Sequence, residues 1–197
     1  KEATQKEVSL NALQFNLFKG LILQDLAIYD EQRIILRVSE ASCAFLIAPI
    51  LQKKLIIPNL RIRSAYIFLE RKSDSAFNIQ ELFLGRPSQT SGKGFSLFVS
   101  KVDVSDAKVD FRDSTFSPPV SKEIERLDLI LYLSLPAKIK FISKAVIKGK
   151  PGVDITSSGE YAILDKRFTG RLALGGFNPR EFGEYFRNLA VNISAGT

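Results

Sequence analysis

The ten residues 126–135, RLDLILYLSL, decide the fold class of this chain. A leucine occupies every second position from Leu127 to Leu135, and the residues between them are an aspartate, an isoleucine, a tyrosine and a serine. A period of two places successive side chains on opposite faces of an extended backbone. The stretch therefore predicts a β-strand with one apolar, half-buried face.

The same alternation continues along most of the chain. We expect strands at 8–17, 21–29, 33–46, from Leu55 onwards, and at 127–135, 139–147, 153–164 and 167–174. The segments between many of them are short turns, at 19–20, 30–32, 136–137 and 165–166. Sequential strands joined by short turns form an antiparallel meander. The sequence therefore predicts a mainly β fold.

Several of these strands change phase partway along. Leu21 and Leu23 require one parity, whereas Leu26 and Ile28 require the other. Similar slips separate 60–62 from 65–69 and 97–99 from 102–104. A slip of this kind is typical of a β-bulge, which bends and twists a sheet. We therefore expect a long sheet that curls.

Helices are predicted to be few and short. Pro49 suits the first turn of a helix over 48–54, and Asn78 with Glu81 resembles a capping box that opens a helix ending near Gly85. An amphipathic helix is predicted from Asn178, with apolar residues at Phe182, Tyr185, Phe186 and Leu189. The Gly/Ser/Pro-rich stretch 85–94 is predicted to be an exposed loop between an N-terminal half, 1–84, and a C-terminal half, 95–197.

The composition argues against most enzyme classes. Histidine is absent and Cys43 is the single cysteine, so neither His-dependent catalysis nor a cysteine cluster for a metal is expected. Asp103 with Asp106, and Asp110 with Asp113, are pairs that acid–base chemistry can use, but they also suit solvated strand faces and turns. We therefore expect a non-catalytic protein without a cofactor.

Basic residues exceed acidic ones, and the net charge is +7. Four lysines, at positions 138, 140, 144 and 148, share one face of a predicted strand. Such a row is typical of a solvated outer face, and it also suits acidic lipid heads or a nucleic-acid backbone. Nucleic-acid binding sheets interleave exposed aromatics with the charge, whereas Phe141 and Phe168 here share parity with aliphatic residues. No nucleic-acid partner is therefore expected.

The predicted strands outnumber the helices available to cover them. A sheet with one apolar face must bury that face against helices, a second sheet, itself or a ligand. Two solutions remain open from the pattern alone. The sheet closes into a filled barrel or sandwich, or it curls into an open trough that aliphatic chains can occupy.

A family resemblance favours the open trough. The segments 13–30, 48–62, 65–71, 77–82, 104–113 and 158–161 resemble, in type and order, the hairpins, helix and Asn-containing segment of AsmA-like proteins, which include TamB-type and chorein-N-like envelope proteins. The glycine usual before the Asn segment is replaced here by Ser75 and Ala76. The motifs are degenerate patterns of residue type, and they cover most of the chain.

The resemblance implies a long, curved antiparallel meander that forms an open, taco-like groove lined with aliphatic side chains. It implies a module that carries phospholipid, or another acyl lipid, between membranes on the periplasmic side of the bacterial inner membrane. The anchoring helix is expected upstream of Lys1, because this chain has no methionine and no run of about 20 apolar residues.

We predict that eight residues line the groove: Leu129, Leu131, Leu133, Ile139, Phe141, Ile155, Phe168 and Leu172. The alternative for each of them is a place in a closed core. The alternative function is a protein-interaction or outer-membrane assembly module, in which a sheet edge accepts a strand from an envelope protein partner.

Overall fold

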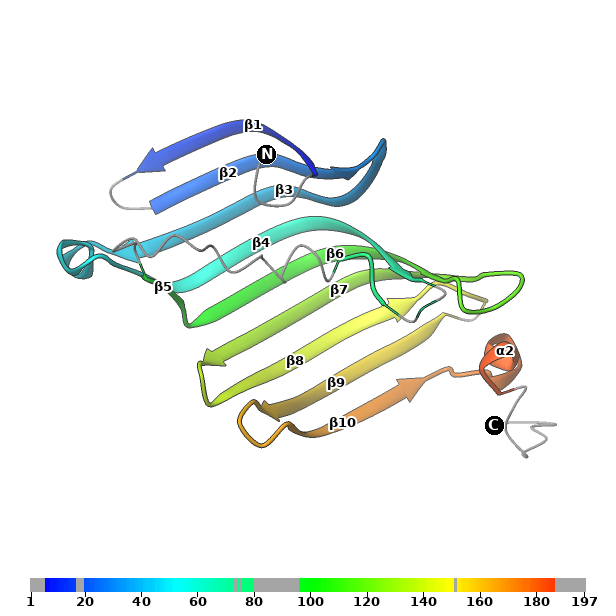
Figure 1. Ribbon diagram of the computed structural model, residues 1–197. Coiled ribbons are helices and arrows are strands. Elements are labelled where there is room, and N and C mark those ends of the chain that lie inside the picture. The colour runs from blue at the N-terminus through cyan, green and yellow to red at the C-terminus, as the bar shows by residue number, and fades with distance from the viewer. Residues whose placement is uncertain are drawn as a thin grey trace.

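All strands in the described part of the chain belong to one open sheet (Figure 1). The computed structural model describes residues 6–16, 20–72, 74, 76–79, 96–150 and 152–186. The strands are β1 (Glu7–Asn16), β2 (Gly20–Asp30), β3 (Arg33–Leu46), β4 (Lys54–Arg71), β5 (Ser96–Val99), β6 (Lys101–Asp113), β7 (Val120–Ser134), β8 (Lys138–Ile147), β9 (Val153–Ala162) and β10 (Arg167–Gly175). Their order is β1-β2-β3-β4-β6-β7-β8-β9-β10, with β5 beside β4. The edges β1 and β10 do not meet, so the predicted open, mainly β fold is confirmed and the closed barrel is wrong.

One pair of neighbours departs from the predicted antiparallel meander. β4 and β6 run parallel, from Leu60 opposite Val102 to Arg71 opposite Asp113, and β5 is also parallel to the start of β4. The sheet therefore consists of two antiparallel meanders, β1–β4 and β6–β10, joined side by side. A parallel pair needs a long return connection, and here it runs between Arg71 and Ser96. The predicted loop 85–94 falls within this connection and lies outside the described residues.

The helical segments in the described part of the chain are short, as predicted. They are η1 (Ala48–Gln52), η2 (Pro179–Phe182) and α2 (Gly183–Phe186). The predicted helix over 48–54 is a single 3-10 turn that ends at Lys53, where φ is 57°. The last part of the predicted C-terminal helix, including Leu189, lies outside the described residues.

The Asn78 side chain bonds to the end of a strand, and most of the helix predicted to follow it lies outside the described residues. Asn78 accepts a hydrogen bond from the backbone N–H of Glu70 and donates one to the carbonyl of Phe68, both at 2.9 Å. These two bonds fasten the start of the return connection to the end of β4. Glu81, the other half of the predicted capping box, lies outside the described residues.

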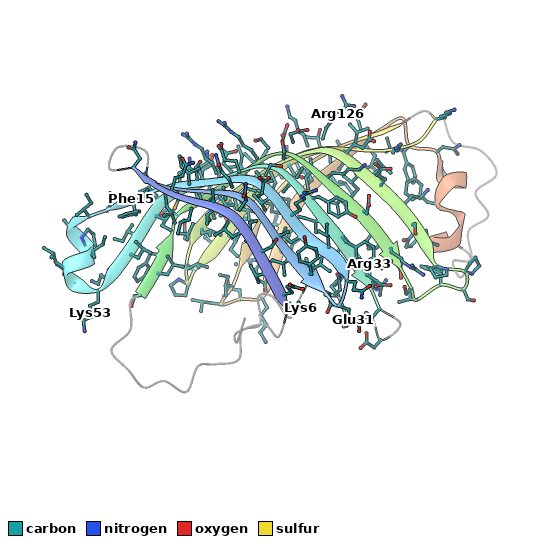
Figure 2. The ribbon with its side chains drawn as sticks, turned by 90° about the horizontal axis from the view of Figure 1, so that it is seen from above. Lys6, Phe15, Glu31, Arg33, Lys53 and Arg126 are labelled. Atoms are coloured by element: carbon teal, nitrogen blue, oxygen red, sulfur yellow. The ribbon has the colours of Figure 1, made fainter. Side chains whose placement is uncertain are left out.

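Two of the three predicted phase slips, those in β2 and β4, coincide with a bend that crosses the sheet, whereas the slip predicted between 97–99 and 102–104 is the break at Ser100 between β5 and β6. Asp25, Ser64, Asp106 and Arg126 have φ between 48° and 52°, a left-handed conformation that interrupts strand alternation. In β2, β3 and β4 the slips lie opposite one another in neighbouring strands. The pairing register is therefore the same before and after them. These slips are therefore kinks and not the predicted bulges, and register shifts of the bulge type occur instead between β6 and β7 and between β7 and β8, where the sequence predicted none. Figure 2 shows the resulting arch, with Arg126 on its outer side.

The inside of the bend is packed with small residues. Val38, Ala41, Ala65 and Ala107 are buried in one cluster, and larger residues from both sides of the slip pack against it, among them Leu23, Leu26, Ile62 and Val104. Bending brings inward-facing side chains together, so alanine fits where leucine would collide. Apolar residues from the segments before and after each slip join the same cluster. The slips therefore keep the apolar side chains on a single face of the sheet.

The residues at the bend that do not join this cluster form an exposed polar ladder. Ser39 Oγ donates to the carbonyl of Ser64, and Ser64 Oγ donates to Asp106 Oδ2, both at 3.2 Å. The backbone N–H of Asp106 donates to Asp128 Oδ1 at 3.0 Å. These bonds connect β3, β4, β6 and β7 and help to hold the kinks of neighbouring strands at one level.

Candidate functional site

All eight residues predicted to line the groove lie on the same face of the sheet. Leu131 is opposite Phe141 and Leu133 is opposite Ile139, so β7 and β8 present these side chains together. The register carries the face onward to Ile155 on β9 and to Phe168 and Leu172 on β10. We call the face that carries these eight residues the apolar face.

The apolar face extends far beyond the eight predicted residues. One row of directly paired positions crosses nine strands: Phe15, Leu21, Cys43, Leu60, Val102, Leu131, Phe141, Gly159 and Gly170. At about 4.8 Å per strand the row is roughly 38 Å long, which exceeds the hydrocarbon thickness of a bilayer, about 30 Å. The N-terminal members were missed because the sequence shows alternation within a strand but not which strands pair.

The large side chains of the apolar face are in contact with solvent. None of the eight is buried, and Phe168 and Leu172 are 63% and 66% exposed. By contrast, five of the ten buried apolar residues of the described chain are alanines. An ordinary core buries its leucines and phenylalanines. This sheet instead leaves them half-covered, so its apolar face has room for a further apolar layer.

Two phenylalanines cover a pair of glycines at the β10 end of the face. The rings of Phe141 and Phe168 stack with their centroids 5.7 Å apart. A Cβ at Gly159 would lie 2.6 Å from the carbonyl oxygen of Thr169 and 2.7 Å from the Phe141 ring, so only glycine fits there. The rings therefore rest directly on the backbone, and the sheet is one layer thick at this point.

A polar spot interrupts the apolar face between β8 and β9. The hydroxyl oxygens of Ser143 and Ser157 are 2.6 Å apart and share a hydrogen bond. They lie in one row with Leu129 on β7 and Leu172 on β10. Because the two hydroxyls bond to each other, the spot offers little unmet polarity to an apolar ligand.

The opposite face is charged, and the lysine row lies on it. Lys138 and Lys140 approach Glu160 at 3.3 and 3.6 Å. Lys148 pairs with Glu123 at 2.9 Å and Lys108 also pairs with Glu123, so the two ammonium groups lower the pKa of this carboxyl. The row is thus partly neutralised, as expected for an outer face.

The carboxylate pairs considered for acid–base chemistry are engaged in structural contacts. Asp103 pairs with Lys101 at 3.1 Å. Asp110 accepts a hydrogen bond from the Tyr66 hydroxyl at 2.8 Å, and burial together with this bond raises the pKa of Tyr66 to about 12.

Asp113 is almost completely buried and lies 3.5 Å from Arg71. Burial acts to raise the pKa of Asp113, but hydrogen bonds from Thr115 and the charge of Arg71 outweigh it, so the pKa is lowered. This carboxylate anchors the turn that follows β6, because Thr115 donates to it from both its backbone N–H and its hydroxyl.

Comparison with known proteins does not assign a family. No protein-family model matches the chain, and no curated protein matches it. No helix in the part of the chain that the structure describes is long and apolar enough to cross a bilayer.

Proposed function

We propose that this chain is a non-catalytic module that binds acyl lipid and passes it along its apolar face. The observation that carries the proposal is the exposure of large apolar side chains on an open sheet in which alanines make up half of the buried apolar residues of the described chain. A contiguous apolar surface of this kind is rare on a soluble monomer unless something binds there. Acyl chains fit, because they need a long apolar surface and no specific polar partner.

Burial of hydrocarbon supplies the affinity. Each methylene removed from water contributes about 0.8 kcal/mol. The burial of one long acyl chain therefore supplies enough favourable free energy for the lipid to leave a membrane for a continuous apolar surface. The headgroup stays in water at the open side. Since no single contact is strong, a chain can move by one row of side chains at a time without a high barrier.

The resemblance to AsmA-like proteins supports the same reading. It favours a phospholipid as the lipid, and a location on the periplasmic side of a bacterial inner membrane. An anchoring helix upstream of Lys1 and envelope protein partners belong to the same proposal. The curved, open, single-layer sheet is compatible with the groove that such proteins are expected to form.

An assembly module is the second candidate, because both sheet edges are unprotected in the described chain. Every residue of β10 (Arg167–Gly175) is exposed, and the strand has no proline. Edge strands of this kind accept a strand from a partner. This function would give a lipid-free protein that binds its partner through β10 and loses that binding when a lysine replaces Leu172.

Lipid content tests the first proposal directly. The protein is purified without detergent, extracted with organic solvent and examined by mass spectrometry, and the extracted protein is then offered a fluorescent fatty acid. We expect copurified phospholipid and saturable loading. If no lipid copurifies and none can be loaded, the lipid proposal is wrong.

A further inference from the structure

A shallow hollow of about 600 Å³ lies on the charged face of the last three strands. β8, β9 and β10 are neighbours at one end of the sheet (Figure 1). The polar side chains that line the hollow are Lys140, Ser158, Glu160, Arg167, Thr169 and Arg171. The proposed lipid function makes no use of this site, because the acyl chains occupy the other face.

The strand register explains why these side chains converge. Lys140 is opposite Glu160, which is opposite Thr169, and the next row on one side pairs Ser158 with Arg171. These positions alternate with those of the apolar face, so their side chains point away from it. Gly159 and Gly170 line the hollow with backbone atoms, because these two positions belong to the apolar face.

The hollow has an excess of positive charge. Its one carboxylate, Glu160, is shared by Lys140 and the neighbouring Lys138. Arg167 and Arg171 form no ion pair with any residue that the structure describes. Elsewhere on the charged face, by comparison, several lysines have an acidic partner, as Lys101 has Asp103 at 3.1 Å. Two guanidinium groups beside an already neutralised carboxylate suit an anion from outside the chain.

We propose that the hollow binds the phosphate group of an acidic lipid head. A guanidinium presents a planar fork of donors that matches phosphate oxygens, and the Ser158 and Thr169 hydroxyls can donate from the floor between the two arginines. A volume of about 600 Å³ holds more than a bare phosphate. The site rests on the proposed function, since it assigns the place at which the β10 end of the sheet meets an anionic membrane.

Vesicle flotation tests the site. The intact chain is mixed with phosphatidylcholine vesicles, with and without phosphatidylglycerol, and the bound fraction is measured. We expect binding to the anionic vesicles that falls with rising ionic strength. The double variant Arg167→Gln/Arg171→Gln should bind about 30-fold more weakly, because each basic residue near an anionic surface strengthens binding by roughly fivefold.

The control variant removes the same charge from the same chain outside the hollow, with Arg126→Gln/Lys144→Gln. If both double variants weaken binding equally, or if anionic vesicles are not bound at all, the site proposal is wrong. Glycerol 3-phosphate is then added as a soluble competitor, which distinguishes recognition of the phosphate from attraction to the membrane as a whole. Displacement of the vesicles from the wild type indicates that the hollow itself recognises phosphate. If glycerol 3-phosphate does not displace them, the result counts against the site.

Fatty-acid loading separates this proposal from the one on which it rests. The Arg167→Gln/Arg171→Gln protein should load a fluorescent fatty acid as well as the wild type does, because the apolar face is unchanged. Loss of vesicle binding with normal loading therefore supports the hollow. Failure of loading in the wild type overturns the lipid function, whereas loss of loading in this variant alone overturns the assignment of the hollow.

Discussion

Replacing Phe168 and Leu172 together by serine should abolish most acyl binding without unfolding the protein. The two side chains are 63% and 66% exposed, so the buried third of each contributes about 0.5–1 kcal/mol to the folded state, and the free energy of unfolding should fall by about 1–2 kcal/mol in total. Complete burial of such a side chain stabilises by about 1.5–3 kcal/mol. A bound chain that covers the exposed two-thirds therefore gains about 1–2 kcal/mol from each residue.

The double variant Phe168→Ser/Leu172→Ser should accordingly raise the Kd for a fluorescent fatty acid by roughly 30- to 900-fold. The matched control is Leu51→Ser/Leu164→Ser, which removes two apolar side chains that are 91% and 77% exposed in a 3-10 turn and a β-turn, away from the apolar face. Fluorescence titration and urea unfolding are measured on both. Equal affinity in both variants would refute the assignment of the apolar face.

Three further substitutions test the structure. Ala107→Leu on the inside of the bend should cost about 1–3 kcal/mol in urea unfolding, whereas Ala173→Leu on exposed β10 should change stability by less than about 0.5 kcal/mol. Arg126 has φ of 50°, a conformation that glycine adopts without strain, so Arg126→Gly should stabilise the folded state by up to about 1 kcal/mol. The control Arg61→Gly, in regular strand, should destabilise it. If both substitutions changed the free energy of unfolding in the same direction, the result would count against the kink. Asp113→Asn should lose about 1 kcal/mol at neutral pH. Because the pKa of Asp113 is lowered in the folded state, the stability difference between wild type and variant should be complete above the ordinary carboxyl pKa, about 3.9, and should disappear as the pH falls through the folded-state pKa. A stability difference that does not change with pH would contradict this prediction.

Strands and their inward-facing residues were predictable from local pattern. The alternation from Leu127 to Leu135 and the turn at Pro136 gave the β7–β8 hairpin with its correct apolar face. The slip between Leu23 and Leu26 gave the bend in β2. Each of these features depends on the spacing of neighbours in one segment, because side chains in an extended backbone alternate whatever lies beside it.

Pairing between distant strands was not predictable in the same way. The parallel contact of β4 with β6 joins Leu60 to Val102 across a connection that carries no local signal of its direction. That contact places the N-terminal meander in line with the C-terminal one and extends the apolar face from eight residues to a row across nine strands. Likewise, the hollow around Glu160 exists only because three strands align their basic positions.

The sequence alone thus determined that the chain forms strands, which side of each strand is apolar, and where β2 and β4 bend, since all three follow from spacing along one backbone. The tertiary structure alone decided that the strands remain a single open layer, and that the kinks of neighbouring strands fall at one level. The physical reason is that hydrogen bonds between strands set register, and register depends on pairs of residues far apart in the chain.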